Sequence, residues 1–216
     1  MKEYFDFNQY SQGRKKFYDK LADFKIDYDN ISQPIILDHI FFNKVNLEFK
    51  PFFERRKQKG RLSRIESENY KSQFNNLNAQ LIDIYYYKGP AIYWFKITHA
   101  ENSSNQKLLK KFSSARTNKP GWWSKAGRDI ESKTEYLYVG KVEKNLHDRL
   151  IQHIGLGHVM TSSLKLTHWF HSFEKTQLSF QYLKIEPEFI PYLEDIENVI
   201  WRQLNPLIGA EPRIKS

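Results

Sequence analysis

Two tyrosines stand in apolar segments of the chain. Tyr93 lies within residues 91–97 and Tyr138 within residues 134–141, and both segments are rich in aromatic and β-branched residues. This composition predicts buried or half-buried strands, in which alternate side chains point to the same face. If the two strands pair, the two phenols converge. A phenol has a pKa near 10, so acid–base chemistry near neutral pH would require positive charge beside it.

A cation and an imidazole follow the second of these segments. Arg149 and His153 are four residues apart, which places them on one face of a helix. Asn145 is a suitable N-cap for that helix, and Asp148 is a weaker form of a capping-box acid. The apolar residues that recur at helical spacing are Leu146, Leu150 and Ile154. The pattern predicts a helix that presents Arg149 and His153 together at the edge of its buried stripe.

A carboxylate occupies an unusual position near the end of the chain. Glu197 falls within the helical repeat formed by Leu193, Ile200 and Leu204. A carboxylate that faces the core is costly unless it meets a cation, a metal or several hydrogen-bond donors. Glu194, one turn earlier, is expected to be a solvated acid. The pattern therefore singles out Glu197 as an acid that needs a cation, a metal or several donors beside it.

The order and spacing of these residues resemble the GIY-YIG nuclease family. Residues 91–93 (Ala-Ile-Tyr) and 138–140 (Tyr-Val-Gly) match its two strand motifs, Arg149 follows on a helix, and Glu197 lies on a later helix. The resemblance covers roughly residues 89–209.

The chain also departs from the family pattern. Ala91 replaces the first motif glycine, and Gly209 stands where the family has a tail asparagine. About forty residues separate the two motifs, where many relatives have a tight hairpin.

The resemblance implies phosphodiester hydrolysis with one divalent cation, Mg²⁺ or Mn²⁺. Glu197 would hold the cation, Tyr93 would deprotonate the attacking water, and Arg149 would stabilise the charge on the phosphate. Tyr138 and His153 would position the reacting groups, and Lys141 would supply positive charge near the phenol. The implied catalytic residues are Tyr93, Tyr138, Lys141, Arg149, His153 and Glu197.

Composition narrows the class of protein. The chain has 216 residues, 40% hydrophobic and 16% aromatic residues, which is enough for one domain with an extension or at most two small domains. It has no cysteine, which excludes disulfides and thiol chemistry. It shows no signal-peptide pattern and no apolar run of membrane-spanning length, so we expect a cytoplasmic protein without a membrane partner. The oligomeric state is not predicted.

The net charge of +9 favours a polyanionic partner, and DNA is expected, with RNA as the alternative. Basic residues and tryptophans cluster between the two strand motifs, and more basic residues precede them. The candidate nucleic-acid-binding residues are Lys110, Lys111, Arg116, Lys119, Trp122, Trp123, Arg55 and Arg56. Lysines and arginines interleaved with aromatics suit phosphate contact and base stacking. The alternative is a solvated loop with one tryptophan held in the core.

The expected fold class is α+β, with a small sheet of about three strands packed with helices. Residues 1–85 are predicted to form a mostly helical N-terminal region. Residues 86–216 would form the nuclease-like domain, with a basic insertion at 99–133. The expected helices span residues 5–25, 50–80 (with a possible break at Gly60), 162–169 and 188–204, residues 34–45 are either strand or helix, and a third strand spans 177–185.

Three other functions remain open from the sequence. The chain could be a catalytically inactive nucleic-acid-binding protein, a nuclease directed at RNA, or a structural or partner-binding protein. A zinc site formed by His168, His171 and Glu174 is not favoured, since no fourth ligand is evident.

Overall fold

The computed structural model describes residues 24–59, 63–99, 104–118, 121–125, 134–158 and 160–212, together with residues 15, 19 and 21. The side chains of residues 28, 56–59, 64, 99 and 104 are outside this description. The helix expected at residues 5–25 falls almost entirely outside it.

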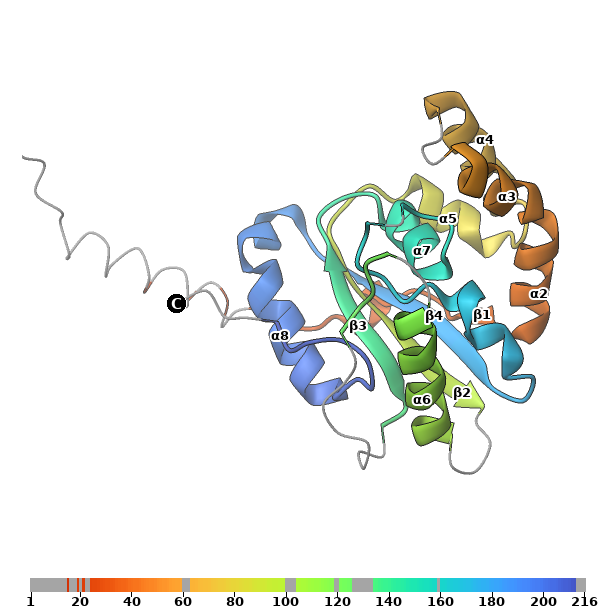
Figure 1. The fold of residues 1–216 in the computed structure, drawn as a ribbon. Helices are drawn as coiled ribbons and strands as arrows, with labels where there is room; N and C mark the ends of the chain where they lie inside the picture. Colours follow the sequence, from red (N-terminus) through yellow and green to blue (C-terminus); the bar gives the residue numbers. More distant parts are fainter. Residues whose placement is uncertain are drawn as a thin grey trace, which may run out of the picture.

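Each described strand is followed along the chain by one or more helices (Figure 1). The strands are β1 (Ile35–Leu37), β2 (Ala91–His99), β3 (Tyr136–Val142) and β4 (Gln177–Lys184). The α-helices are α2 (His39–Glu48), α3 (Lys50–Lys59), α4 (Arg64–Asn75), α5 (Gln80–Tyr86), α6 (Ser104–Asn118), α7 (Leu146–Ile154) and α8 (Leu193–Leu204). Short 3-10 helices are η1 (Tyr28–Asn30), η2 (Leu166–His168), η3 (Phe170–Ser172) and η4 (Pro187–Tyr192). The fold class is α+β, as expected.

The described strands form one four-stranded antiparallel sheet in the order β1-β4-β2-β3. The sheet therefore has one strand more than expected, because β1 is only three residues long and too short to show a hydrophobic period. In the register of the sheet, Tyr93 on β2 lies opposite Gly140 on β3 and opposite Tyr182 on β4. Residues directly opposite each other point to the same face of a sheet.

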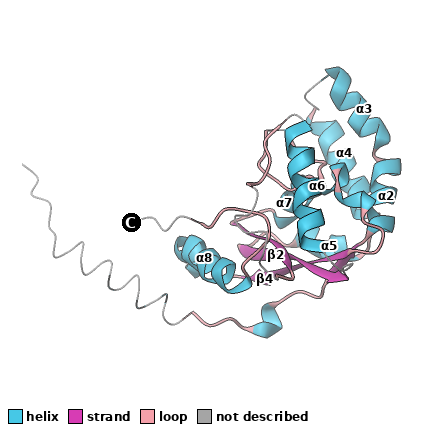
Figure 2. Cartoon of the chain, turned by 60° about the horizontal axis from the view of Figure 1, so that its bottom comes forward, coloured by secondary structure: helices cyan, strands magenta, loops and turns pink. Residues whose placement is uncertain are grey.

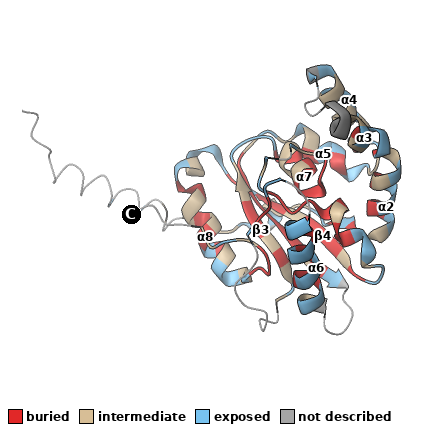
Figure 3. Cartoon of the chain, in the orientation of Figure 1, coloured by how far each residue is buried: buried red, intermediate tan, exposed pale blue. Residues whose placement is uncertain are grey.

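The two faces of the sheet are covered differently (Figure 2). α8 packs against one face, where Ile92, Trp94 and Val139 meet its apolar side. The other α-helices lie over the opposite face, which carries Tyr93 and Phe95. The strands are buried along most of their length, as Figure 3 shows. One face therefore holds the phenols and the other holds the glutamate helix.

The N-terminal region shares the core of the sheet. Leu37 and Phe42 are fully buried in the same cluster as Tyr93 and Phe180. β1 is also an edge strand of the sheet, paired with β4. The boundary expected near residue 85 thus falls within the last turn of α5, inside one continuous core.

Several expected helices differ in detail from the structure. Residues 50–80 form α3, α4 and the start of α5 rather than one long helix, and Ser63 begins α4 with a capping box to Glu66. The span expected at 188–204 begins as the 3-10 helix η4, which contains Pro191, a residue without a backbone N–H, before α8 starts. The helix expected at 162–169 is replaced by η2 and η3.

Asn145 occupies the predicted N-cap position of α7, and its carbonyl accepts the N–H of Arg149 at 3.2 Å, but the expected side-chain cap is absent. Asn145 precedes α7 in the left-handed conformation, at φ 59°, and its side chain makes no capping hydrogen bond. Asn tolerates this conformation better than most residues, so it serves the turn from β3 into α7 instead. Asp148 pairs with Lys71 of α4 at 3.0 Å and does not act as a capping acid.

The insertion between β2 and β3 contains an amphipathic helix. Leu108 and Phe112 of α6 are fully buried in the core. Across the residues that the structure describes, no helix combines the length and apolar character needed to cross a membrane.

Candidate active site

The hydroxyl of Tyr93 is the centre of a buried hydrogen-bond cluster. Arg149 Nε donates to it at 2.9 Å, and His153 Nε2 lies 2.9 Å away. Tyr93 and His153 are both fully buried. The structure therefore brings together residues from β2 and α7 whose convergence the sequence pattern predicted.

The hydrogen bonds of His153 assign its tautomer. The backbone N–H of Leu164 donates to His153 Nδ1 at 3.2 Å, so Nδ1 is the unprotonated nitrogen of a neutral ring. The pKa of His153 is well below its ordinary value, because burial and then the charge of Arg149 disfavour the imidazolium. Nε2 then carries the proton and donates to Tyr93. The Tyr93 oxygen thus accepts from two N–H groups.

Three hydrogen bonds fix the plane of the Arg149 guanidinium. Besides the bond from Nε to Tyr93, Nη1 donates to Gln152 Oε1 at 2.9 Å and to the carbonyl of Ser162 at 3.1 Å. The phenols and their hydrogen bonds to Arg149 outweigh burial and raise its pKa, so it stays charged. Arg149 is a fixed positive charge beside both tyrosines.

Gly140 allows the phenols to approach the backbone of β3. A Cβ at this position would lie 2.5 Å from Tyr93 Oη, 2.7 Å from Tyr93 Cζ and 2.8 Å from Tyr138 Cε1. The rings of Tyr93 and Tyr138 stack with centroids 6.2 Å apart. The motif glycine is therefore explained by the space that two phenols occupy.

Both phenols resist ionisation in this arrangement. Burial raises the pKa of Tyr93 well above its ordinary value, the neighbouring Tyr138 adds to this, and Arg149 opposes it. Burial also raises the pKa of Tyr138, against hydrogen bonds from Arg149 and Tyr93. Tyr93 therefore keeps its proton until further positive charge arrives.

Glu197 reaches this cluster from the other face of the sheet. The buried stripe of α8 consists of Leu193, Ile196 and Ile200, with Leu204 half-buried beside it. Glu197 follows Leu193 by one turn and is half-buried. β3 is the edge strand on this side, and its backbone N–H at Lys141 hydrogen-bonds to Glu197.

The surroundings of Glu197 favour its protonated form. Burial raises its pKa to about 7; Lys141 and Arg149 lower it, while the carboxylate of Glu194 raises it further. Glu197 also enters the electrostatics of both Tyr93 and Tyr138, where its charge raises their pKa values. The carboxylate, the phenols and the guanidinium therefore belong to one electrostatic site.

Lys141 is held at the border of the site. Its Nζ lies 3.7 Å from Glu194 Oε2 on α8. Glu194, expected to be a solvated acid, is half-buried and paired with Lys141. All six candidate catalytic residues thus lie in one region of the molecule, and Glu194 joins them.

The basic residues of α6 lie on its solvent side. Lys110, Lys111 and Arg116 are exposed, while the opposite side of the helix is buried. Trp122 is 59% exposed and Trp123 only 7%. Trp123 packs against Phe112, so its ring is part of the core and is not available for base stacking in this conformation.

The other candidate basic residues are Arg55, Arg56 and Lys119, and only Arg55 has a described side chain. Arg55 Nη2 pairs with Glu66 Oε1 at 3.0 Å, which joins α3 to α4. The side chain of Arg56 and all of Lys119 lie outside the described residues.

The loop at residues 162–165 was not singled out by sequence reasoning. The Ser162 carbonyl and the Leu164 N–H hold Arg149 and His153, as described above. Lys165 adopts φ 50° and Trp169 Nε1 donates to the Leu164 carbonyl at 2.9 Å, which fixes the loop. These contacts use backbone groups, which leave no pattern in the sequence.

Few side chains near the phenols could act as ligands of a metal cation. No group of three or more His, Cys, Asp or Glu residues is placed to hold a metal ion in the part of the chain that the structure describes. Glu197 is the carboxylate whose charge acts on both phenols, and Glu194 lies one turn earlier on α8. Oxygen ligands of this kind fit a hard cation that retains most of its water.

Comparison of the chain with models of protein families, with curated proteins and with solved structures found no match.

Proposed function

We propose that this protein is a metal-dependent endonuclease of the GIY-YIG type that hydrolyses phosphodiester bonds in DNA and works in the cytoplasm. The observation that carries the proposal is the convergence of Tyr93, Arg149, His153 and Glu197, which come from three elements and both faces of the sheet. The net charge of +9 suits a polyanionic substrate.

A single Mg²⁺ or Mn²⁺ is the cofactor that this proposal requires. Glu197 would hold it, because a half-buried carboxylate with a raised pKa, and with no ion pair to the residues that the structure describes, is stabilised by a cation. When bound, such a cation supplies Lewis-acid stabilisation of the phosphate and lowers the pKa of nearby groups.

The protein's own residues would divide the remaining work. Arg149, fixed by three hydrogen bonds, would neutralise charge that develops on the phosphate. Tyr93 would take a proton from the attacking water once it has lost its own, and two N–H donors stand ready to stabilise its phenolate oxygen. His153 would orient that oxygen, and Tyr138 would help position the nucleophile.

An inactive nucleic-acid-binding protein is the second candidate. The observation in its favour is that Tyr93 is fully buried and its pKa is raised, so that in this conformation its hydroxyl neither contacts solvent nor releases a proton easily. An RNA-directed nuclease would use the same groups.

The test combines substrates with conservative variants. Plasmid DNA, single-stranded DNA and RNA are incubated with and without Mg²⁺, and we expect Mg²⁺-dependent cleavage of DNA. Tyr93→Phe should reduce the rate by about 10²-fold or more, as is usual for loss of a general base. Tyr70→Phe, a half-buried tyrosine that packs against Phe52 of α3, is the control.

Binding of the cation has a readout of its own. Mg²⁺ should raise the melting temperature of the wild-type protein but not of Glu197→Gln, because a ligand stabilises only the form that binds it. Wild-type protein that cleaves no nucleic acid yet binds DNA would instead support the inactive candidate.

A further inference from the structure

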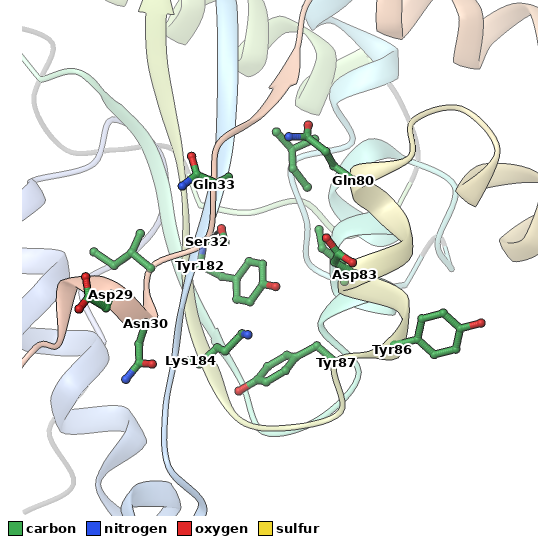
Figure 4. Close-up of a pocket in the computed structure, with 13 residues that line it drawn as sticks. Asp29, Asn30, Ser32, Gln33, Gln80, Asp83, Tyr86, Tyr87, Tyr182 and Lys184 are labelled. Atoms are coloured by element: carbon green, nitrogen blue, oxygen red, sulfur yellow. Dashed lines mark hydrogen bonds between the residues drawn. The ribbon is translucent and has the colours of Figure 1, made fainter.

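A cavity lies beside the candidate active site on the phenol face of the sheet. It has a volume of about 480 Å³ and is bordered by α5, β4 and the segment that leads from η1 into β1 (Figure 4). None of the candidate catalytic residues lines it. Its size lies within the range of small-molecule sites.

Aromatic rings form one wall of this cavity. The rings of Tyr87 and Tyr182 lie 5.6 Å apart at 34°. The Tyr87 hydroxyl donates to the Pro90 carbonyl at 2.5 Å, which fixes that ring. Lys184 Nζ lies 5.7 Å from the centre of the Tyr87 ring. A flat ligand would meet rigid aromatic surface beside a positive charge.

Polar groups face the same space. Asp83 on α5 is close enough to Tyr182 to raise the pKa of that phenol, though less than burial does. In the described part of the chain, Asp83 forms no ion pair with Lys184 and the Tyr182 hydroxyl forms no hydrogen bond. An acceptor, a hydroxyl and a cation are thus available together for a ligand.

The cavity lies one strand away from Tyr93. Tyr182 is the direct partner of Tyr93 in the register of β4 and β2. Paired residues are about 5 Å apart and point to the same face. Lys184 pairs with Ala91, the first residue of β2. It therefore lies near the end of β2 that carries Tyr93. A nucleic-acid strand bound at Arg149 would run close to the mouth of the cavity.

We propose that this cavity binds a single unstacked nucleotide whose base carries an amino group. The base would lie against the half-buried ring of Tyr87 and donate to Asp83, because an ionised carboxylate only accepts hydrogen bonds, and its phosphate would meet Lys184. Enzymes that act on nucleic acids take single bases out of the stack in this manner. This inference rests on the proposed function. The cavity would give the proposed nuclease a preference for substrates that contain an unpaired base.

The experiment measures binding without cleavage. Fluorescence anisotropy in EDTA compares a perfect DNA duplex with the same duplex that carries one bulged adenine. Wild-type protein should bind the bulged duplex about tenfold more tightly. Asp83→Ala should abolish this preference and leave affinity for the perfect duplex unchanged. Glu54→Gln, an exposed acid on α3, is the matched control and should keep the preference.

Titration with AMP, CMP, GMP and TMP separates two sources of the nucleotide. Binding of AMP, CMP or GMP that is lost in Asp83→Ala, without preference for the bulge, would assign the cavity to free nucleotides. Preference for the bulge assigns it to the substrate strand. If Asp83→Ala changes neither the preference for the bulged duplex nor the binding of AMP, CMP or GMP, the inference is overturned. This holds even when Mg²⁺-dependent cleavage is normal. Loss of cleavage alone would overturn only the proposed function.

Discussion

The contacts of Tyr93 explain why its neighbours have their particular side chains. Its hydroxyl accepts from Arg149 and His153, and its ring passes close to the backbone of Gly140. Each of these groups holds the others in place, so a small change at one should be felt at all of them.

Gly140→Ala should disturb the site although it adds only a methyl group. The new Cβ would lie 2.5 Å from Tyr93 Oη and 2.7 Å from its Cζ, so the ring must move. We expect unfolding free energy to fall by about 1–3 kcal/mol, and Mg²⁺-dependent cleavage to fall about 10²-fold through misplacement. Chemical denaturation and cleavage assays measure both effects.

A double-mutant cycle shows whether contact with the Tyr93 ring causes the loss of stability in Gly140→Ala. In a Tyr93→Leu background, the added methyl group has fewer atoms to meet, so Gly140→Ala should cost less, with a coupling of about 1 kcal/mol or more. Additive effects of the two changes would contradict the steric explanation.

Glu197 should make the protein less stable as the pH rises. Its pKa is about 7 in the folded protein against an ordinary 4.5, so between these values the unfolded chain releases a proton that the folded protein keeps. Stability from this group therefore falls from pH 4.5 to 7, by at most about 3 kcal/mol, and by less where water screens the half-buried carboxylate. Glu197→Gln should be more stable than wild type at pH 8 and equal to it at pH 4.

Denaturation curves from pH 4 to 8 test this difference between the two proteins. The exposed Glu174→Gln provides the control for loss of one surface charge. A stability difference between Glu197→Gln and wild type that does not vary with pH would remove the case for a destabilised carboxylate.

For single residues, the sequence predicted which side chains form the candidate site better than it predicted their burial and contacts. Residue type and spacing selected Tyr93, Arg149 and Glu197, and the structure brings them into one electrostatic site. Helical spacing placed Glu197 among apolar residues of α8, but only the structure shows its hydrogen bond to the backbone of Lys141 on β3. Trp123 could not be told from Trp122 by pattern, because only the core contact with Phe112 separates them.

α6 combines a buried side with a basic solvent side. If this side contacts phosphates, replacing Lys110, Lys111 and Arg116 with glutamine should weaken DNA binding. The slope of log affinity against log salt should flatten by about 0.9 for each phosphate that the protein no longer neutralises. Titrations from low to high salt measure the slope.

A matched triple replacement, Lys44→Gln with Lys50→Gln and Lys175→Gln, removes three positive charges from other parts of the surface. An equal change of slope with both sets would mean that only net charge matters, and that α6 does not touch the DNA.

The elements that sequence predicted well are those with a clear period. β2, β3, β4 and α7 fall close to their expected bounds because their apolar residues alternate or recur regularly. β1 has three residues, and α6 lies in a segment expected only as a basic insertion, so neither gave a strong signal. η4 interrupts an expected helix where Pro191 removes a hydrogen-bond donor.

The molecule as a whole has one core in which its N-terminal region takes part. Leu37, Phe42 and Phe49 are fully buried against residues of the sheet and its covering helices. A fragment that starts at residue 86 would expose this surface and the edge of β4. We expect it to lack a cooperative thermal transition by circular dichroism, whereas the longer chain unfolds in one step.

A fragment that melts cooperatively with native-like ellipticity would show that residues 86–216 fold independently. The expected division at residue 85 would then separate two regions, of which the second folds without the first although they share a core. Adding residues 24–85 as a separate peptide provides the control, since docking should restore a cooperative transition in the expected case and raise the melting temperature in the other.

The position of α8 has a consequence for the timing of activity. Glu197 follows every other catalytic residue in the chain and meets the phenols only by docking on the far face of a finished sheet. A chain that is still being synthesised holds its tyrosines and its arginine, but lacks the acid that would complete them. For the proposed nuclease, cleavage would therefore begin only after α8 has covered the sheet.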